Sequence, residues 1–154
     1  METTVTIRTT DELTSQELIK IMAERVKVFV VEQECAYQEV DQLDFKAQHV
    51  LITRGAQLVA YARIVPNEDP DYISFGRVLV VQQFRGQHLA SQLVQATLDE
   101  IAREYGPQPV KIAAQSYLQR FYGSFGFRPV SNVYLEDGIP HVDMVLERQL
   151  VKKD

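Results

Sequence analysis

Apolar residues along this chain follow two spacings, and these spacings predict the order of its elements. Short β-branched and aromatic runs predict strands at residues 4–8, 49–53, 58–65, 72–81, 110–114, 128–134 and 141–150. Apolar residues three and four positions apart predict helices at about residues 11–29, 89–105 and 117–126. The order β-α-β-β-β-α-β-α-β-β predicts an α/β (α+β) fold, in which helices cover a mixed sheet.

Capping and breaking residues mark several ends of the predicted helices. Thr10 or Asp11 can cap the first helix, and Ser116 can cap the third. Gly106, with the proline that follows it, ends the second helix. The end of the first helix is not defined by the pattern, because the run from Val26 to Val31 is β-branched.

The segment from Glu32 to Lys46 has no clean period and contains five acidic residues. It predicts a long ordered loop or a broken helix. Loops of this length inside compact domains are often functional. The segment either attracts a cationic ligand by its field or forms a solvated acidic face, and the sequence supports both readings equally.

Length and composition indicate an ordinary globular protein. At 154 residues the chain can bury one sizeable core, and we expect a single domain that spans residues 1–154. Hydrophobic residues make up 45% and charged residues 24%, which argues against disorder. The net charge of −5 gives no support for general binding to nucleic acid.

The chain shows no signal for export, membrane insertion or metal binding. Its first residues lack a signal-peptide pattern and no apolar run approaches a membrane span, so we expect a cytoplasmic protein without a membrane partner. The single cysteine, Cys35, excludes an internal disulfide and a cysteine-rich metal site. The three histidines, His49, His88 and His141, lack metal-ligand spacing, so we expect no metal.

One stretch carries the first chemical signal. An apolar run, Val78 to Val81, is followed by a polar turn, then by Arg85 and Gly86, and then by the second helix. A helix start with free N–H groups beside an arginine is a ready anion site, and phosphate is its usual occupant. The phosphate-binding patterns G-x-x-x-x-G-K-[ST] and G-x-G-x-x-G are absent. A tight turn with a surface arginine explains this stretch equally well.

A second segment, QSYLQRFYGSFGF at residues 115–127, favours the phosphate site. Together the two segments resemble the GNAT superfamily of acetyl-CoA-dependent N-acetyltransferases. The stretch from Arg85 to Ala90 matches the first and last positions of the family's pyrophosphate loop, Arg/Gln-x-x-Gly-x-Gly/Ala. The stretch from Tyr122 to Phe127 matches its Tyr-x-x-x-Gly-Phe signature, with Gln115 in the place of an asparagine. The segments RVKVFVVEQECAYQEVDQLD and YLEDGIPHVDM look most like the ElaA-like branch.

The resemblance implies a mostly antiparallel central sheet of about six to seven strands and a site for acetyl-CoA as co-substrate. Backbone groups of a strand would pair with the pantetheine arm, and N–H groups of the loop and helix start would hold the pyrophosphate. The residues that this implies are Val78, Leu79, Val80, Arg85, Gly86, Gln87, His88, Leu89, Ala90, Ser91 and Gln115.

The resemblance also implies catalytic roles. Tyr122 is the expected proton donor to the departing thiolate, because a phenol near pKa ~10 can protonate a thiolate near ~8.5 when held beside it. The alternative for Tyr122 is a core aromatic residue. The base that takes the proton of the amine is expected to be His141, with Glu32 and His49 as further candidates.

Some residues depart from the pattern or allow two interpretations. His88 stands where the superfamily usually has glycine; a negative φ would tolerate it, and a positive φ would weaken cofactor binding. Arg63 and Arg77 can hold a carboxylate of the acceptor, but pairing with carboxylates of the acidic segment is the expectation. Cys35 is expected to be inert and partly buried.

We therefore predict direct acetyl transfer to an amine of a small molecule or a peptide. The alternatives are a catalytically silent CoA-binding or regulatory module, an acyl-homoserine-lactone synthase, and an unrelated interaction domain. An edge strand near residues 145–151 makes a homodimer plausible.

Overall fold

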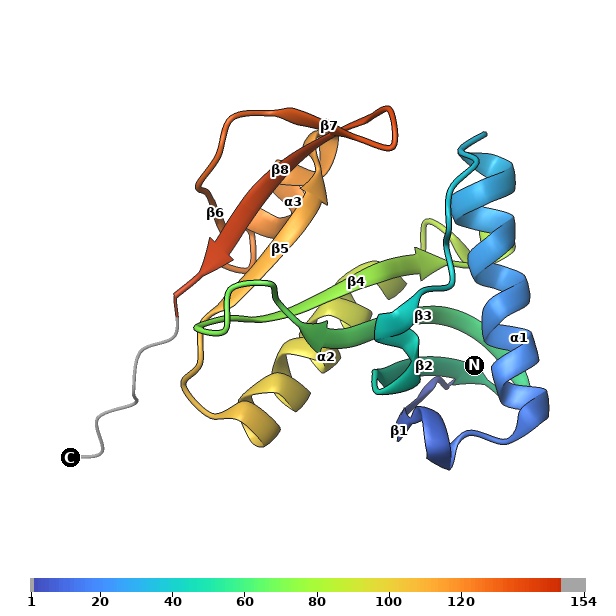
Figure 1. The fold of residues 1–154 in the computed structure, drawn as a ribbon. Helices are drawn as coiled ribbons and strands as arrows, with labels where there is room; N and C mark the ends of the chain where they lie inside the picture. Colours follow the sequence, from blue (N-terminus) through green and yellow to red (C-terminus); the bar gives the residue numbers. More distant parts are fainter. Residues whose placement is uncertain (1, 148–154) are drawn as a thin grey trace.

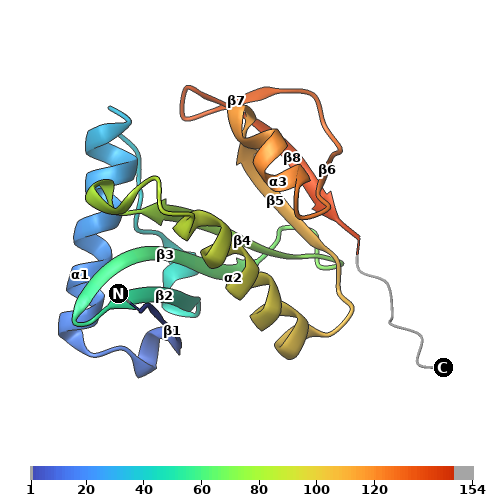
Figure 2. The same cartoon turned by 180° about the vertical axis from the view of Figure 1, so that it is seen from behind.

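The computed structural model describes residues 2–147 and contains one eight-stranded sheet with helices on both faces (Figures 1 and 2). The strands are β1 (Thr4–Thr9), β2 (Gln48–Arg54), β3 (Gln57–Pro66), β4 (Ile73–Val80), β5 (Val110–Gln115), β6 (Arg128–Pro129), β7 (Tyr134–Glu136) and β8 (Ile139–Leu146). The α-helices are α1 (Ser15–Val26), α2 (Leu89–Tyr105) and α3 (Gln119–Gly123). Shorter helical turns are η1 (Thr10–Glu12), η2 (Lys27–Glu32), η3 (Gln42–Phe45), η4 (Gln82–Phe84) and η5 (Ser116–Leu118).

The sheet has the order β1-β2-β3-β4-β5-β8-β6, with β7 paired to β8. Its neighbouring strands are antiparallel except for β4 and β5, which are parallel. The prediction of a mixed, mostly antiparallel sheet flanked by helices is confirmed. The sheet has eight strands where the resemblance implied six to seven.

Two hydrophobic cores lie on opposite faces of this sheet. Helix α1 covers one face, while α2 and α3 cover the other (Figures 1 and 2). Strand side chains alternate between the faces, so Tyr61 of β3 packs in the α1 core and Ala60 in the α2 core. This two-sided burial explains why β3 reads as a nearly continuous apolar run.

Strands β4 and β5 diverge, and this divergence opens the sheet. Only Ile73 and Val110 pair between them. Residues 74–80 of β4 therefore have no strand partner on the side of β5. On its other side β4 carries a bulge, because Arg77 and Val78 together oppose the single residue Ala62 of β3. Arg77 has φ of 51°, which marks the bulge as a local distortion of the strand.

Local contacts correct two of the predicted ends. The cap of α1 is Thr14, not Thr10 or Asp11, because the Thr14 side chain accepts from the Glu17 N–H and the Glu17 carboxylate accepts from the Thr14 N–H. Helix α1 then continues into the π-helical turn η2, so the β-branched run stays helical. Gly106 ends α2 as predicted, with φ of 62°.

The predicted strand at residues 128–134 is wrong, because it is divided into β6 and β7. The residues between β6 and β7 contact β8 through two hydrogen bonds that are not part of a regular strand pairing. The Val130 N–H donates to the Asp143 carbonyl, and the Asp143 N–H donates to Ser131 Oγ. Pro129 has no N–H to offer to a ladder. The edge strand predicted at residues 145–151 lies mostly outside the described residues, since β8 ends at Leu146.

Two features are absent from residues 2–147. No helix in this range is both long and apolar enough to cross a bilayer. No group of three or more His, Cys, Asp or Glu side chains in the same range is placed to hold a metal ion.

Candidate functional site

A cleft of about 1040 Å³ follows the opening between β4 and β5. Its walls come from β4, the start of α2, β5, α3, the segment after α1, and the turn between β7 and β8. The residues predicted to hold acetyl-CoA that line it are Val78, Leu79, Val80, Arg85, Gly86, His88, Leu89, Ala90, Ser91 and Gln115. Gln87 is exposed and does not line the cleft. Both predicted catalytic residues, Tyr122 and His141, line the same cleft.

One end of the cleft is formed by the start of α2. The first hydrogen bond of α2 runs from the Gln92 N–H to the His88 carbonyl. The N–H groups of Leu89, Ala90 and Ser91 therefore have no hydrogen-bond partner within the helix. Three consecutive free N–H groups at a helix start favour an anion. Arg85 lies beside them, although its guanidinium donates to the Val80 carbonyl and pairs with Glu32 at 2.9 Å.

His88 is the N-cap of α2 and has φ of 61°. The interpretation in which a negative φ tolerates this histidine is therefore wrong. The left-handed region costs a residue with a Cβ roughly 1 kcal/mol, and histidine is one of the side chains that adopt it more often. The position thus has the backbone conformation that favours glycine.

We expect His88→Gly to raise the free energy of unfolding by about 0.5–1 kcal/mol, because glycine adopts φ of 61° without strain. Urea unfolding measures this effect. Gln87→Gly is the matched control, because residue 87 is not among the positive-φ positions and glycine there should only destabilise. A variant His88→Gly that is less stable than the wild type contradicts the expectation.

Tyr122 lies on α3 at the floor of the cleft and is 5% exposed. Its ring packs edge-on against Phe121 and Phe127, with centroids 5.1 and 5.9 Å away. Burial, with a smaller contribution from Tyr117, raises the pKa of Tyr122 above its ordinary value of 10.0. The hydroxyl therefore stays protonated at neutral pH and can act only as a proton donor or a hydrogen-bond donor. Tyr122 is thus both a core aromatic residue and a cleft residue.

His141 lies on β8 opposite Tyr134 of β7, and the two rings stack with centroids 6.3 Å apart. Its Nδ1 lies 2.7 Å from the Ile139 carbonyl. A carbonyl only accepts, so neutral His141 carries its proton on Nδ1 and its lone pair on Nε2. Nε2 lies 3.9 Å from Glu136 Oε2. The ring is therefore held with its basic nitrogen free to take a proton.

The other two candidate bases are placed differently. Glu32 lines the cleft but is paired with Arg85 near the start of α2. His49 is fully buried in the sheet and does not line the cleft. The Thr10 hydroxyl donates to the Asp44 carbonyl, so it accepts from His49 Nε2, and His49 Nδ1 accepts from the Tyr61 hydroxyl. The role of His49 as a base is therefore excluded by its position.

His49 should make the fold sensitive to mild acid. Burial lowers the pKa of His49 to about 4 from an ordinary 6.5. Between these values the unfolded chain binds a proton that the folded chain excludes, so stability is lost as the pH falls through this window. We expect the free energy of unfolding to drop by up to about 3 kcal/mol from this group. Urea unfolding across this range measures the loss, and His49→Gln should flatten the slope; an equal slope in the variant contradicts this origin.

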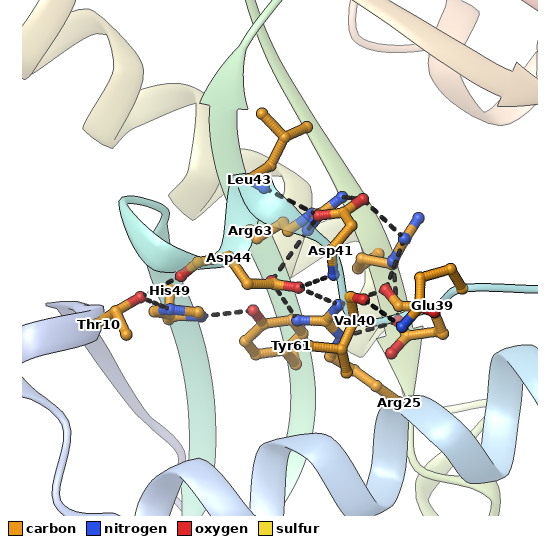
Figure 3. A network of polar contacts seen from close by, with 12 residues as sticks. Thr10, Arg25, Glu39, Val40, Asp41, Leu43, Asp44, His49, Tyr61 and Arg63 are labelled. Atoms are coloured by element: carbon orange, nitrogen blue, oxygen red, sulfur yellow. Dashed lines mark hydrogen bonds and ion pairs between the residues drawn. The ribbon is translucent and has the colours of Figure 1, made fainter.

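A buried network of ion pairs joins the acidic segment to α1 and the sheet (Figure 3). Arg25 of α1 is 0% exposed, and it donates from Nε to Glu39 at 2.8 Å and from Nη1 to Asp44 at 2.6 Å. Arg63 of β3 pairs with Asp41 at 2.8 Å and with Asp44 at 2.9 Å. Burial alone would raise the pKa of Asp44, but its hydrogen bonds with Arg25 and Asp41 lower it to about 2. The Asp44 carboxylate therefore stays ionised inside the network.

Arg77 extends the network to the bulge of β4. It pairs from Nε with Glu39 at 2.8 Å and from Nη2 with Asp41 at 3.4 Å. Its guanidinium also lies 5.4 Å from the ring centre of Tyr37. The expectation that Arg63 and Arg77 pair with the acidic segment is confirmed. Neither reading of that segment is correct for Glu39 and Asp44, which are buried and neutralised by arginines.

Sequence reasoning missed the buried ion pairs of Arg25 and the place of Glu136 and Asp137 in the cleft. Arg25 follows Ile21 and Met22 by four and three positions, so it occupies the apolar stripe of α1. This position in the sequence could have indicated that Arg25 is buried. Glu136 and Asp137 lie near His141 only because β7 and β8 form a hairpin. Cys35 is buried as expected, lines the cleft, and contacts the Asp137 carbonyl at 3.4 Å.

Comparisons with known proteins show the family of this chain. A family model described as an acetyltransferase (GNAT) domain matches residues 10–148. Protein ElaA of Escherichia coli is 42% identical over 139 residues, which cover 88% of this chain and 91% of ElaA.

Solved structures give the same picture. An acyl-CoA N-acyltransferase from Pseudomonas aeruginosa superposes with a TM-score of 0.89 at 40% identity, over 94% of this chain and 99% of that one. The crystal structure of ElaA gives 0.88 at 39% identity, over 95% and 100%. A CoA-dependent acyl-homoserine lactone synthase, BjaI, gives 0.80 at 16% identity, over 96% and 84%, and at that identity it shows the fold alone.

Proposed function

Because this chain belongs to the GNAT acetyltransferase family, we propose that it transfers an acetyl group from acetyl-CoA to the amine of a small molecule or a peptide. The observation that supports the proposal most strongly is that three features line the same cleft. These are the free N–H groups at the start of α2, the unpaired edge of β4, and the buried phenol of Tyr122.

The cleft residues fit acetyl-CoA at both ends. The N–H groups of Leu89, Ala90 and Ser91 would hold the pyrophosphate, for which a helix start is suited. The backbone of residues 78–80 would pair with the amides of the pantetheine arm, because this edge of β4 has no strand partner on the side of β5. Acetyl-CoA supplies an activated acetyl group as a thioester.

Two side chains are suited to the proton transfers. An alkyl ammonium has a pKa near ~10.4, so a base must take its proton before the nitrogen can attack. His141 Nε2 has the free lone pair for this step. Tyr122 can donate its proton to the sulfur as the carbon–sulfur bond breaks and the carbon–nitrogen bond forms. Since its pKa is raised, Tyr122 starts the reaction protonated.

Binding and turnover experiments test this proposal separately. Calorimetric titration with CoA is expected to show one site, and a panel of primary amines with acetyl-CoA is expected to release free thiol steadily. Binding of CoA without release on any amine supports the silent CoA-binding module instead. The absence of CoA binding would contradict the proposed use of acetyl-CoA in this cleft.

A further inference from the structure

In the part of the chain that the structure describes, some charged side chains that line the cleft form ion pairs with arginine, aspartate or glutamate, and others do not. The paired ones are Glu32, Asp41, Arg63, Arg77 and Arg85, each of which has an ion pair with a residue of opposite sign. Glu136 and Asp137, at the turn between β7 and β8, also line the cleft. Within residues 2–147 neither carboxylate has an ion pair with an arginine or a lysine. The end of the cleft near His141 therefore carries an excess of negative charge.

The position of His141 indicates where a ligand would contact the negatively charged end of the cleft. The residue is 8% exposed, and within the described residues its Nε2 has no hydrogen-bond partner. Glu136 Oε2 lies 3.9 Å from this nitrogen. This nitrogen carries a free lone pair in a residue that lines the cleft, so it can accept a hydrogen bond from a donor of a bound ligand. The reacting amine would meet this lone pair, and a second positive charge of the same molecule would meet the Glu136 carboxylate beside it.

The two walls of the cleft touch at this end. The Cys35 thiol, after the π-helical turn η2, donates to the Asp137 carbonyl at 3.4 Å, although the two residues lie 102 positions apart. The contact joins the segment after η2 to the turn between β7 and β8, and both residues line the cleft.

We propose that the acceptor is a small alkylamine with a second positive charge, such as a diamine or polyamine, and that Glu136 determines this preference. The inference rests on the proposed function. The arginines that could attract an acceptor with a carboxylate, Arg63 and Arg77, are already occupied by Asp41 and the other acidic residues of the network. A carboxylate near the far end of the acceptor would meet Glu136 and Asp137 without a counter-charge.

Three straight-chain amines test the preference: cadaverine, pentylamine and aminocaproate, whose far ends are positive, neutral and negative. We expect kcat/KM to fall in that order, with cadaverine ahead of pentylamine by about fivefold, the size of a partly exposed ion pair. In Glu136→Gln this advantage should largely disappear. Glu136 is 53% exposed, so the substitution is compatible with the fold.

Glu68→Gln is the matched control, because it removes the same charge from an exposed turn outside the cleft and should leave the ratio unchanged. Equal kcat/KM for the three amines, or an unchanged ratio in Glu136→Gln, overturns the inference while the proposed function stands. Failure to acetylate any of the three amines or of a broader amine panel, with CoA still bound, overturns both.

Discussion

Tyr122→Phe should lower kcat for acetyl transfer by about 100-fold or more, because proton donation by a side chain typically accelerates a reaction by about this factor. The Kd for CoA should stay within about a factor of two. The ring keeps its packing against Phe121 and Phe127, so the fold and the cleft are retained. Only the hydroxyl is lost, and with it the proton for the departing sulfur. The expected signature is a fall in kcat with little change in binding.

Steady-state kinetics and CoA titration of the same preparations separate these effects. Tyr105→Phe is the matched control, because Tyr105 ends α2, does not line the cleft and donates its hydroxyl to Gln48 of β2. Its loss should leave kcat unchanged. If Tyr122→Phe turns over like the wild type, Tyr122 is a packing residue and the proton comes from elsewhere.

Arg25→Met should cost about 3 kcal/mol of the free energy of unfolding, because it removes a buried cation that contacts both Glu39 and Asp44. Each carboxylate then keeps one other arginine, Arg77 for Glu39 and Arg63 for Asp44. Glu39 and Asp44 are 3% and 6% exposed, so water cannot replace the guanidinium. The loss should also release the segment that contains them, since Arg25 contacts both residues directly. Total stability is commonly about 5–15 kcal/mol, so the variant is expected to be marginal.

Urea unfolding of Arg25→Met beside Arg128→Met measures this prediction. Arg128 pairs with Glu147 at the surface, where both side chains are more than half exposed, and its removal should cost less than about 1 kcal/mol. Equal losses in the two variants would contradict the structural role of the buried network. Asp44→Asn should recover part of the stability of Arg25→Met, because it removes the negative charge of one buried carboxylate that loses a cation in that variant.

The elements that local pattern defines were predictable. The strands in the first half of the chain, the helix α2 and its end at Gly106 follow from periodicity and from a glycine. The start of α1 was misplaced because several polar residues precede it, and only the paired contacts of Thr14 and Glu17 select one. The division of residues 128–134 depends on contacts with Asp143 across the sheet, which no local spacing reveals.

The parts of the candidate site that are formed by continuous segments of the chain were predictable. The parts that depend on contacts between distant segments were not. The helix start and Tyr122 lie in two continuous segments, and both proved to line one cleft. The conformation of His88 is a backbone property that its side chain does not indicate. The position of Glu136 beside His141, and the burial of His49, depend on pairings between strands.

The most direct test of acetyl transfer in this cleft is to quantify free CoA and N-acetylated amine in one reaction with acetyl-CoA and an amine. We predict that the two products form in equal amounts, that their formation requires the amine, and that both fall together in Tyr122→Phe. Tight binding of CoA with neither product above the rate without enzyme would contradict the proposed function.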